Sequence, residues 1–215
     1  MTNPSAYNTN IIRERGFCMF EADIHPLNFP YNTPVVTKPQ YEAHIKLYKG
    51  YVDKVNEINK ALADNPEADR ADATYSLFRG LKKGQTYALD GVILHELYFN
   101  NLGDRESRPN HAAGRVIDAF FGSYAAWVKD FKASALSARG WCMLALDQRT
   151  GLFTNLIADT HDDGIVAGAF PILVLDMYEH AYFLDYLTDK GAYIDKFLQY
   201  VNWDVVEERV KRTNA

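Results

Sequence analysis

The sequence predicts an α+β fold, in which an N-terminal helical hairpin is followed by an α/β domain with a small three-stranded antiparallel sheet. Apolar residues recur at three- and four-residue spacing through residues 39–62 and 86–102, which is typical of amphipathic helices. Three short apolar runs, at residues 140–147, 151–158 and 170–176, are bounded by glycine or polar turn residues. Such runs are typical of buried strands.

Composition and charge narrow the functional classes. The 215-residue chain is 47% hydrophobic and 24% charged, as expected of a globular protein with one large domain or two small ones. Its net charge of −5 comes with no basic block, so we expect no nucleic-acid partner. No apolar stretch is long enough to cross a bilayer and the start lacks signal-peptide features, so we expect a cytoplasmic protein without a membrane partner. Cys18 and Cys142 match neither a CxxC motif nor a disulfide framework, and we expect buried free thiols.

The chain is expected to divide into three parts. Residues 1–37 are polar and rich in turn-forming residues, which indicates an N-terminal arm. Residues 38–105 form the predicted helical hairpin domain, and residues 106–215 form the predicted α/β domain. The charged link at residues 103–109 supplies the boundary between these two domains.

Two histidines lie on the apolar stripes of the hairpin helices. His44 recurs in register with Tyr41 in the first helix, and His95 recurs in register with Val92 in the second. A lone histidine on such a stripe is usually a core residue, so each is only a candidate metal ligand. His95 does not begin the HExxH motif of zinc proteases, because Phe99 takes the place of the second histidine.

The other helical segments carry weaker signals. Asn65-Pro66 ends the first helix, a weak helical stretch continues to Leu77, and Lys82-Lys83-Gly84 is expected to form a turn. In the last expected helix, Glu207 and Arg209 are placed on a solvated outer face. Further helices are expected at residues 109–121, 124–137, 178–187, 190–200 and 203–212.

The third predicted strand ends in a potential metal-binding sequence. Asp176 stands at the end of this strand, and His180 opens the next element. The simpler interpretation is that Asp176 caps the following helix while His180 packs nearby. Together with His44 and His95, however, the pair makes three imidazoles and one carboxylate, a ligand set that suits iron or manganese.

At these residues the chain resembles the iron/manganese superoxide dismutases. The stretch Asp176-x-Tyr178-Glu179-His180-Ala181-Tyr182-Phe183 is similar to the family signature D-x-W-E-H-A-Y-Y. The resemblance extends from about Pro30 to the last helix. Further matches are Tyr51-Val52, His95-x-x-Tyr98-x-Asn100, Phe121-Gly122-Ser123, Gly140-Trp141 and Val201-Asn202-Trp203.

The resemblance implies a function and a ligand set. It implies that His44, His95, Asp176 and His180 bind one iron, or manganese, per subunit in a trigonal-bipyramidal site whose fifth ligand is solvent. The implied reaction converts superoxide to oxygen and hydrogen peroxide. The resemblance also implies a homodimer or higher homo-oligomer, in which Glu179 reaches the ligand histidine of the other subunit.

Two further residues receive catalytic roles from the resemblance. Tyr51 matches the gateway tyrosine of the family. The family also requires a side chain that hydrogen-bonds the metal-bound solvent, and His161 is the candidate. Gly91, one helical turn before His95, is expected to leave room for that imidazole. The alternative for His161 is an ordinary polar loop histidine.

Departures from the family pattern leave a rival function open. His44 precedes Tyr51 by seven residues rather than the usual eight, and Leu47-Tyr48 replaces the His-His pair of the family. The alternative is therefore a metal-binding relative with little dismutase activity. Two features of the resemblance differ on the metal. Gly91 together with a donor from the loop is similar to manganese and some archaeal enzymes, whereas Val174 replaces a glycine that is common in manganese enzymes and favours iron. Iron is therefore placed only slightly ahead of manganese.

Overall fold

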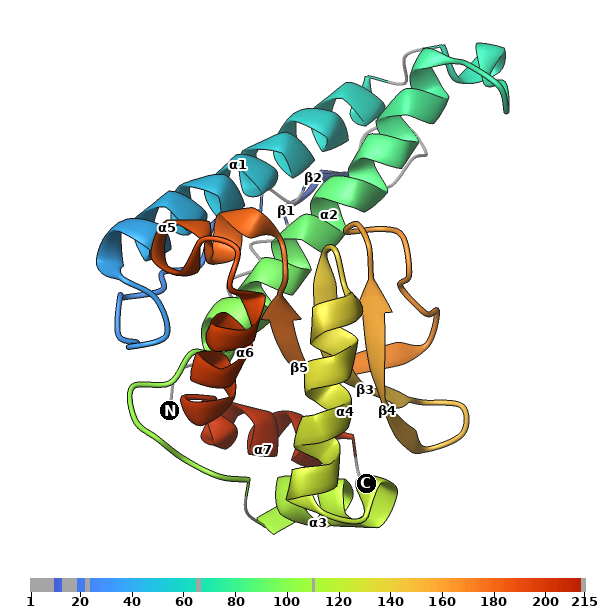
Figure 1. Cartoon of the computed structure of the whole chain (residues 1–215). Helices are drawn as coiled ribbons and strands as arrows, with labels where there is room; N and C mark the ends of the chain where they lie inside the picture. The colour runs from blue at the N-terminus through green and yellow to red at the C-terminus, as the bar shows by residue number, and fades with distance from the viewer. Residues whose placement is uncertain (1–9, 13–18, 22–23, 65–66, 110, 214–215) are drawn as a thin grey trace. The chain divides into compact units, whose positions relative to one another are not determined.

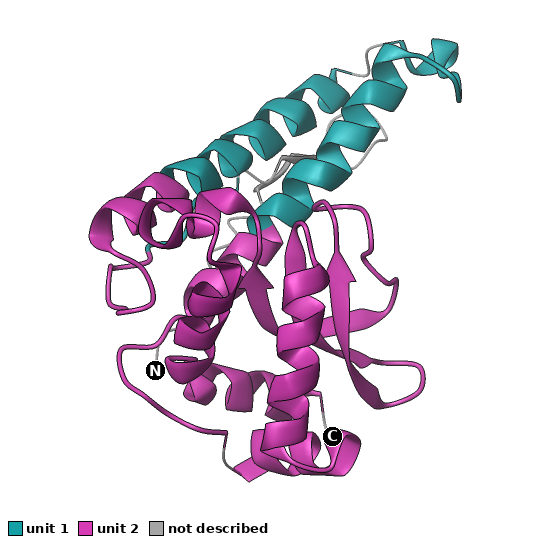
Figure 2. Cartoon of the chain, viewed as in Figure 1, with its two compact units in different colours: residues 1–28, 46–92 teal, residues 29–45, 93–215 magenta. Residues whose placement is uncertain are grey.

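The computed structural model describes residues 10–12, 19–21, 24–64, 67–109 and 111–213. The chain divides into two compact units, one of residues 1–28 and 46–92 and the other of residues 29–45 and 93–215 (Figure 2). The divisions at residues 45/46 and 92/93 each fall inside a long helix. The predicted domain boundary near residue 105 is a different kind of division and stays a prediction. None of the helices in the described part of the chain combines the length and apolar character needed to cross a membrane.

The first unit contains most of two long helices, α1 (Lys38–Ala63) and α2 (Leu77–Asn101) (Figure 1). The predicted turn at Lys82-Lys83-Gly84 is wrong, because these residues continue α2. Lysine forms helices readily, and Gly84 has a packing role, since a Cβ added there would lie 3.3 Å from Ile58 Cδ1. The two helices therefore approach each other closely at this glycine.

The weak helical stretch before Leu77 is mostly absent from the structure. It is reduced to the 3-10 turn η1 (Ala68–Arg70). The carboxylate of Asp72 accepts the backbone N–H groups of Thr74 and Tyr75 at 2.8 and 3.0 Å. This local turn competes with helical hydrogen bonding and delays the start of α2.

The N-terminal segment is only partly within the described residues. Its described portion includes the short antiparallel pair β1 (Asn10–Ile12) and β2 (Met19–Glu21). Residues 24–27 are fixed to α1, because Asn56 bonds both backbone groups of Ile24 and the Tyr48 hydroxyl accepts the N–H of Leu27 at 2.9 Å.

The predicted three-stranded antiparallel sheet is confirmed in the second unit. β3 (Trp141–Asp147) lies between β4 (Leu152–Ala158) and β5 (Ala169–Asp176). Pro171 lies on the edge strand β5, beside the register shift at Leu144/Ala145, where its missing N–H costs little. The central strand β3 is almost wholly buried, so the sheet is covered on both faces at this strand, whereas the edge strand β4 has several exposed residues.

Four helices of the second unit lie close to their predicted positions, and each of the last three begins with a side-chain cap. Ser123, Asp189 and Asn202 accept backbone N–H groups at these three starts. The predicted helix at 178–187 is instead broken at Tyr182. The helices are α3 (His111–Phe121), α4 (Tyr124–Ser137), α6 (Lys190–Gln199) and α7 (Trp203–Arg212).

Large aromatic side chains form part of the core of the second unit, together with aliphatic ones. Trp127, Phe131, Trp141, Tyr193 and Phe197 are all fully buried. Cys142 is a buried free thiol, as predicted, and burial raises the pKa of its side chain. Cys18 lies outside the described residues, so its predicted burial stays a prediction.

Candidate metal centre

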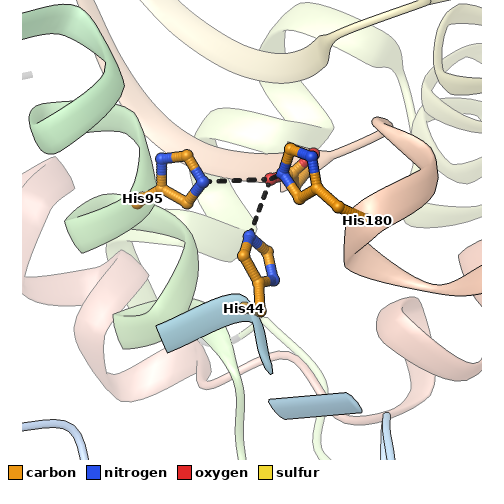
Figure 3. A group of neighbouring side chains, drawn as sticks. His44, His95 and His180 are labelled. Atoms are coloured by element: carbon orange, nitrogen blue, oxygen red, sulfur yellow. Dashed lines mark hydrogen bonds and ion pairs between the residues drawn. The ribbon is translucent and has the colours of Figure 1, made fainter. Parts of the chain in front are cut away.

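Four potential metal ligands meet inside the second unit. His44 comes from α1, His95 from α2 and Asp176 from the end of β5, while His180 lies in the 3-10 turn η2 (Glu179–Ala181). One ligand atom from each lies within 4.8 Å of all the others. Figure 3 shows the three imidazoles pointing toward one another.

The spacing of these atoms fits a single metal ion. The Nε2 atoms of His44, His180 and His95 lie 3.1, 3.3 and 3.7 Å from Oδ2 of Asp176. For metal–ligand bonds of about 2.1 Å, two ligands are about 3.0 Å apart at a right angle and about 3.6 Å apart at roughly 120°. The three distances from Asp176 Oδ2 cover this range, and the ligand atoms of all four residues lie within 4.8 Å of one another, so the four side chains are close enough to share one ion.

The two oxygens of Asp176 have different environments. Oδ1 accepts the backbone N–H of Tyr178 at 2.9 Å, which orients the carboxylate and leaves Oδ2 directed at the imidazoles. Burial alone would raise the pKa of Asp176, but the imidazoles of His180 and His44 outweigh it and hold the pKa well below its usual range. The carboxylate is therefore an anionic ligand at neutral pH.

His44 is suited to bind a metal as a neutral ring. It is 2% exposed, and burial lowers its pKa more than the carboxylate of Asp176 raises it. Its Nε2 has no hydrogen bond of good geometry among the described residues, although Oδ2 is close. A neutral imidazole with this nitrogen in the cluster offers the lone pair that a metal requires.

A buried network connects the elements that carry His95 and Asp176. The guanidinium of Arg209 donates to Asn101 Oδ1 at 2.7 Å, to the carbonyl of Ile172 at 2.9 Å and to that of Leu97 at 3.1 Å. Asn101 in turn donates to the carbonyl of Val174 at 2.7 Å. Through Arg209, helix α7 thereby connects α2 to the strand that ends in Asp176. The contact on α2 is at Leu97, two residues after His95.

The predicted solvated face of α7 is wrong at two positions. Arg209 is 8% exposed and Glu207 is 5% exposed. Glu207 accepts the backbone N–H groups of Ala112 and Ala113 at 3.1 and 2.8 Å, so it caps the start of α3. The amphipathic pattern of α7 could not show this, because the partners are distant in the sequence. The N–H groups that Glu207 caps are 94 and 95 residues away, and the acceptors of Arg209 are 37 to 112 residues away.

His161 is buried beside the four-residue cluster. Its ring centroid lies 5.7 Å from that of His95. The indole N–H of Trp141 donates to His161 Nδ1 at 3.0 Å, so a neutral ring carries its proton on Nε2. Burial lowers the pKa of His161 to about 4, which keeps the ring neutral at physiological pH.

Tyr51 lies in the other compact unit. It is half-buried on α1, and its ring centroid is 6.2 Å from that of Tyr87. Its predicted gateway role therefore stays a prediction, as does the predicted room beside Gly91.

Comparisons with known proteins decide the family. Residues 109–209 match the family model described as iron/manganese superoxide dismutases, C-terminal domain. "Superoxide dismutase [Fe]" of Aquifex aeolicus is 42% identical over 178 residues, which cover 81% of this chain and 82% of that protein. "Superoxide dismutase [Mn] 1" of Halobacterium salinarum is 33% identical over 198 residues, which cover 90% and 97%. The chain belongs to the iron/manganese superoxide dismutase family.

Family membership confirms the resemblance found in the sequence and gives the cluster its metals. Relatives named for iron and for manganese both match, and a further "Superoxide dismutase [Fe]", of Cupriavidus metallidurans, is 38% identical over 73% of this chain. The cluster of three imidazoles and one carboxylate suits a single ion of either metal.

Proposed function

We propose that this member of the iron/manganese superoxide dismutase family is itself a superoxide dismutase, with its metal held by His44, His95, Asp176 and His180. The observation that carries the proposal is the meeting of these four ligand atoms within 4.8 Å in one unit of the fold. Three of the four residues are almost fully buried, a location that isolated acidic or histidine side chains avoid unless they are paired or bind a metal.

The ligand set suits the proposed reaction. When bound, iron or manganese would supply one-electron redox chemistry, oxidising one superoxide to oxygen and reducing the next, with two protons from the solvent, to hydrogen peroxide. Three neutral imidazoles and the Asp176 carboxylate carry a single negative charge, so a divalent or trivalent ion in this site keeps a net positive charge. In the metal-loaded protein that local charge would attract the superoxide anion despite the overall charge of −5.

His161 is the proposed hydrogen-bond donor to solvent at the metal centre. Because its Nδ1 accepts from Trp141, its Nε2–H is the group that can donate. Its low pKa prevents the ring from gaining a second proton, so the donor is neutral and adds no charge. Tyr51 is proposed as the gateway residue on the basis of the family match alone.

Iron is the proposed metal, with manganese as the second choice. The ligand set accepts both ions, so the ligands themselves do not select. The name of the Aquifex aeolicus relative, at 42% identity, specifies iron. Val174, two residues before Asp176, replaces the glycine that is common in manganese enzymes and so favours the same metal.

A homodimer is the proposed assembly. Glu179 is exposed next to the ligand His180, where it can accept the free ring N–H of that histidine in a second copy. Beside it, Phe183, Leu184 and Leu187 are 40%, 65% and 62% exposed, an apolar group that a partner would cover. Sedimentation of the wild type should give a dimer at micromolar concentration, and Glu179→Ala should shift it toward monomer. A wild-type monomer would contradict the assembly.

The cellular location and the domain organisation are also proposed. The proposed location is the cytoplasm, and the proposed organisation is an N-terminal arm, a helical hairpin to residue 105 and an α/β domain from residue 106. Both rest on the sequence patterns described above.

The proposed activity is tested by the decay of superoxide. The protein is stripped with a chelator, reloaded separately with iron and manganese, and mixed with superoxide in a stopped-flow instrument. At least one metal-loaded form should accelerate the decay far above the stripped protein. Full metal content without acceleration would favour the alternative, a metal-binding relative that does little dismutation.

A further inference from the structure

A buried glutamine interrupts the segment that carries the metal ligand His180. Gln40 lies in the first turn of α1 and is 2% exposed. Its Nε2 donates to the carbonyl of His180 at 2.5 Å, and its Oε1 accepts the backbone N–H of Leu184 at 3.1 Å. One side chain therefore uses both ends of its amide on a segment about 140 residues away.

These two backbone groups would bond each other in a continuous helix. The N–H of residue 184 and the carbonyl of residue 180 form the i to i−4 pair of an α-helix. Here the chain turns at Tyr182, whose φ is −142°, between η2 and the single-turn helix α5 (Phe183–Tyr186). The amide of Gln40 takes the place of the missing helical hydrogen bond, and a side chain inserted in this way is a recognised cause of helix breaks.

The same segment has further bonds to the start of α1. The backbone N–H and hydroxyl of Thr37 donate to the carboxylate of Asp185 at 2.6 and 2.7 Å. The hydroxyl of Tyr186 donates to the carbonyl of Val35. A helix of four residues is not stable alone, so these contacts fix the position of α5.

Gln40 also shares a helix face with a second ligand. His44 follows it by four residues, so the two side chains lie one above the other on α1. The rings of His44 and His180 are 4.9 Å apart. Because Gln40 holds the backbone of His180 from the turn that precedes His44, it sets the separation of these two ligands.

We propose that Gln40 is a positioning residue of the metal centre, whose amide replaces the helical hydrogen bond between Leu184 and His180 and thereby fixes His180 opposite His44. The inference rests on the proposed function for its metal, but it concerns metal binding and not turnover. A ligand displaced by about 1 Å loses much of its bonding, and the loss of a hydrogen bond that orients a ligand typically costs 10- to 100-fold in metal affinity.

The test compares three glutamine variants by their affinity for Mn²⁺, measured by competition with a chelator. Gln40→Met keeps the volume but removes the amide, and it should weaken Mn²⁺ binding by about 10-fold or more. Gln40→Glu keeps an acceptor for Leu184 but places an oxygen against the His180 carbonyl, so it should weaken binding further. The control is Gln85→Met, which removes an amide that donates to Asn59. Asn59 lies on α1 nineteen residues after Gln40, away from the metal ligands.

A second measurement separates positioning from general stability. Iron-loaded Gln40→Met should show an altered ferric EPR spectrum, whereas Gln85→Met should keep the wild-type spectrum and affinity even if its unfolding midpoint falls. A Gln40→Met protein with wild-type affinity, within twofold, and an unchanged spectrum would overturn the proposal. If Gln40→Met does not fold, Gln40→Asn, whose amide is one methylene too short, is judged by the same criteria. If Gln40→Met weakens metal binding but the metal-loaded wild type proves inactive, the proposed dismutase function is contradicted. The role of Gln40 in positioning His180 still stands in that case.

Discussion

Replacing Arg209 tests whether the buried network holds the elements of the metal centre together. Arg209→Met keeps most of the apolar stem and removes a guanidinium that makes three hydrogen bonds, two of them to main-chain carbonyls. The residue is 8% exposed, so water cannot easily replace these bonds. Burial lowers the pKa of Arg209 to about 10, which still leaves it charged at neutral pH.

The expected loss follows from opposing contributions. Three hydrogen bonds from a charged donor are worth about 1.5–3 kcal/mol each, or roughly 4.5–9 kcal/mol together. The variant regains several kcal/mol because no charge has to be desolvated on folding. The net loss in the free energy of unfolding is therefore about 3 kcal/mol, a large part of the roughly 5–15 kcal/mol that stabilises a typical protein.

The assay is urea unfolding of the metal-free protein, followed by metal titration. Arg209→Lys should lose less than Arg209→Met, because one ammonium can satisfy some but not all of the acceptors. The matched control is Arg105→Met, which removes a surface pair with Asp204 and should change stability little. If the free energy of unfolding of Arg209→Met lies within about 1 kcal/mol of the wild-type value, the network contributes only what a surface pair does and does not hold the elements together.

Three further predictions concern single residues. His180→Ala should lose the metal, and with it the stabilisation of about 2.7 kcal/mol expected at a hundredfold excess of metal over its dissociation constant. Elemental analysis measures the metal content, and the control is His111→Ala, which changes an exposed histidine. His161→Ala should keep its metal and lose most superoxide turnover, and equal activity at matched metal content would remove His161 from the site. Glu207 has a lowered pKa because the N–H groups that it accepts outweigh the effect of burial, so its stabilising contribution is present above its ordinary pKa of 4.5 and is lost as the pH falls through the folded value. Glu207→Gln should therefore flatten the acid side of the stability profile of the metal-free protein, and an unchanged slope would contradict the cap.

The long helices, the sheet and the cluster could be predicted because their signals are local. His44 and His95 repeat with the apolar stripes of their helices, and Asp176 ends a continuous apolar run. The residue types of the four ligands already suggested one iron or manganese site, and the resemblance then assigned all four to it. Periodicity alone places a histidine on a buried face without identifying its neighbours.

The remaining features depend on partners that are distant in the sequence. The helix expected at 178–187 breaks because Gln40 supplies hydrogen bonds from another segment. Arg209 is buried because Asn101 and two distant carbonyls satisfy it. A charged residue on an amphipathic helix is normally solvated, and only its spatial neighbours show the exception. The sequence places Gln40 four residues before His44 and therefore on the same face of the helix. It does not show that the partners of Gln40 are backbone groups about 140 residues away.

The most direct test of the central claim is an anomalous diffraction experiment on crystals of the metal-loaded protein, at wavelengths on both sides of the iron and manganese edges. We expect one peak per chain, at about 2.0–2.3 Å from Nε2 of His44, His95 and His180 and from Oδ2 of Asp176. A metal peak away from these four atoms, or metal-loaded crystals with no peak among them, would contradict the account.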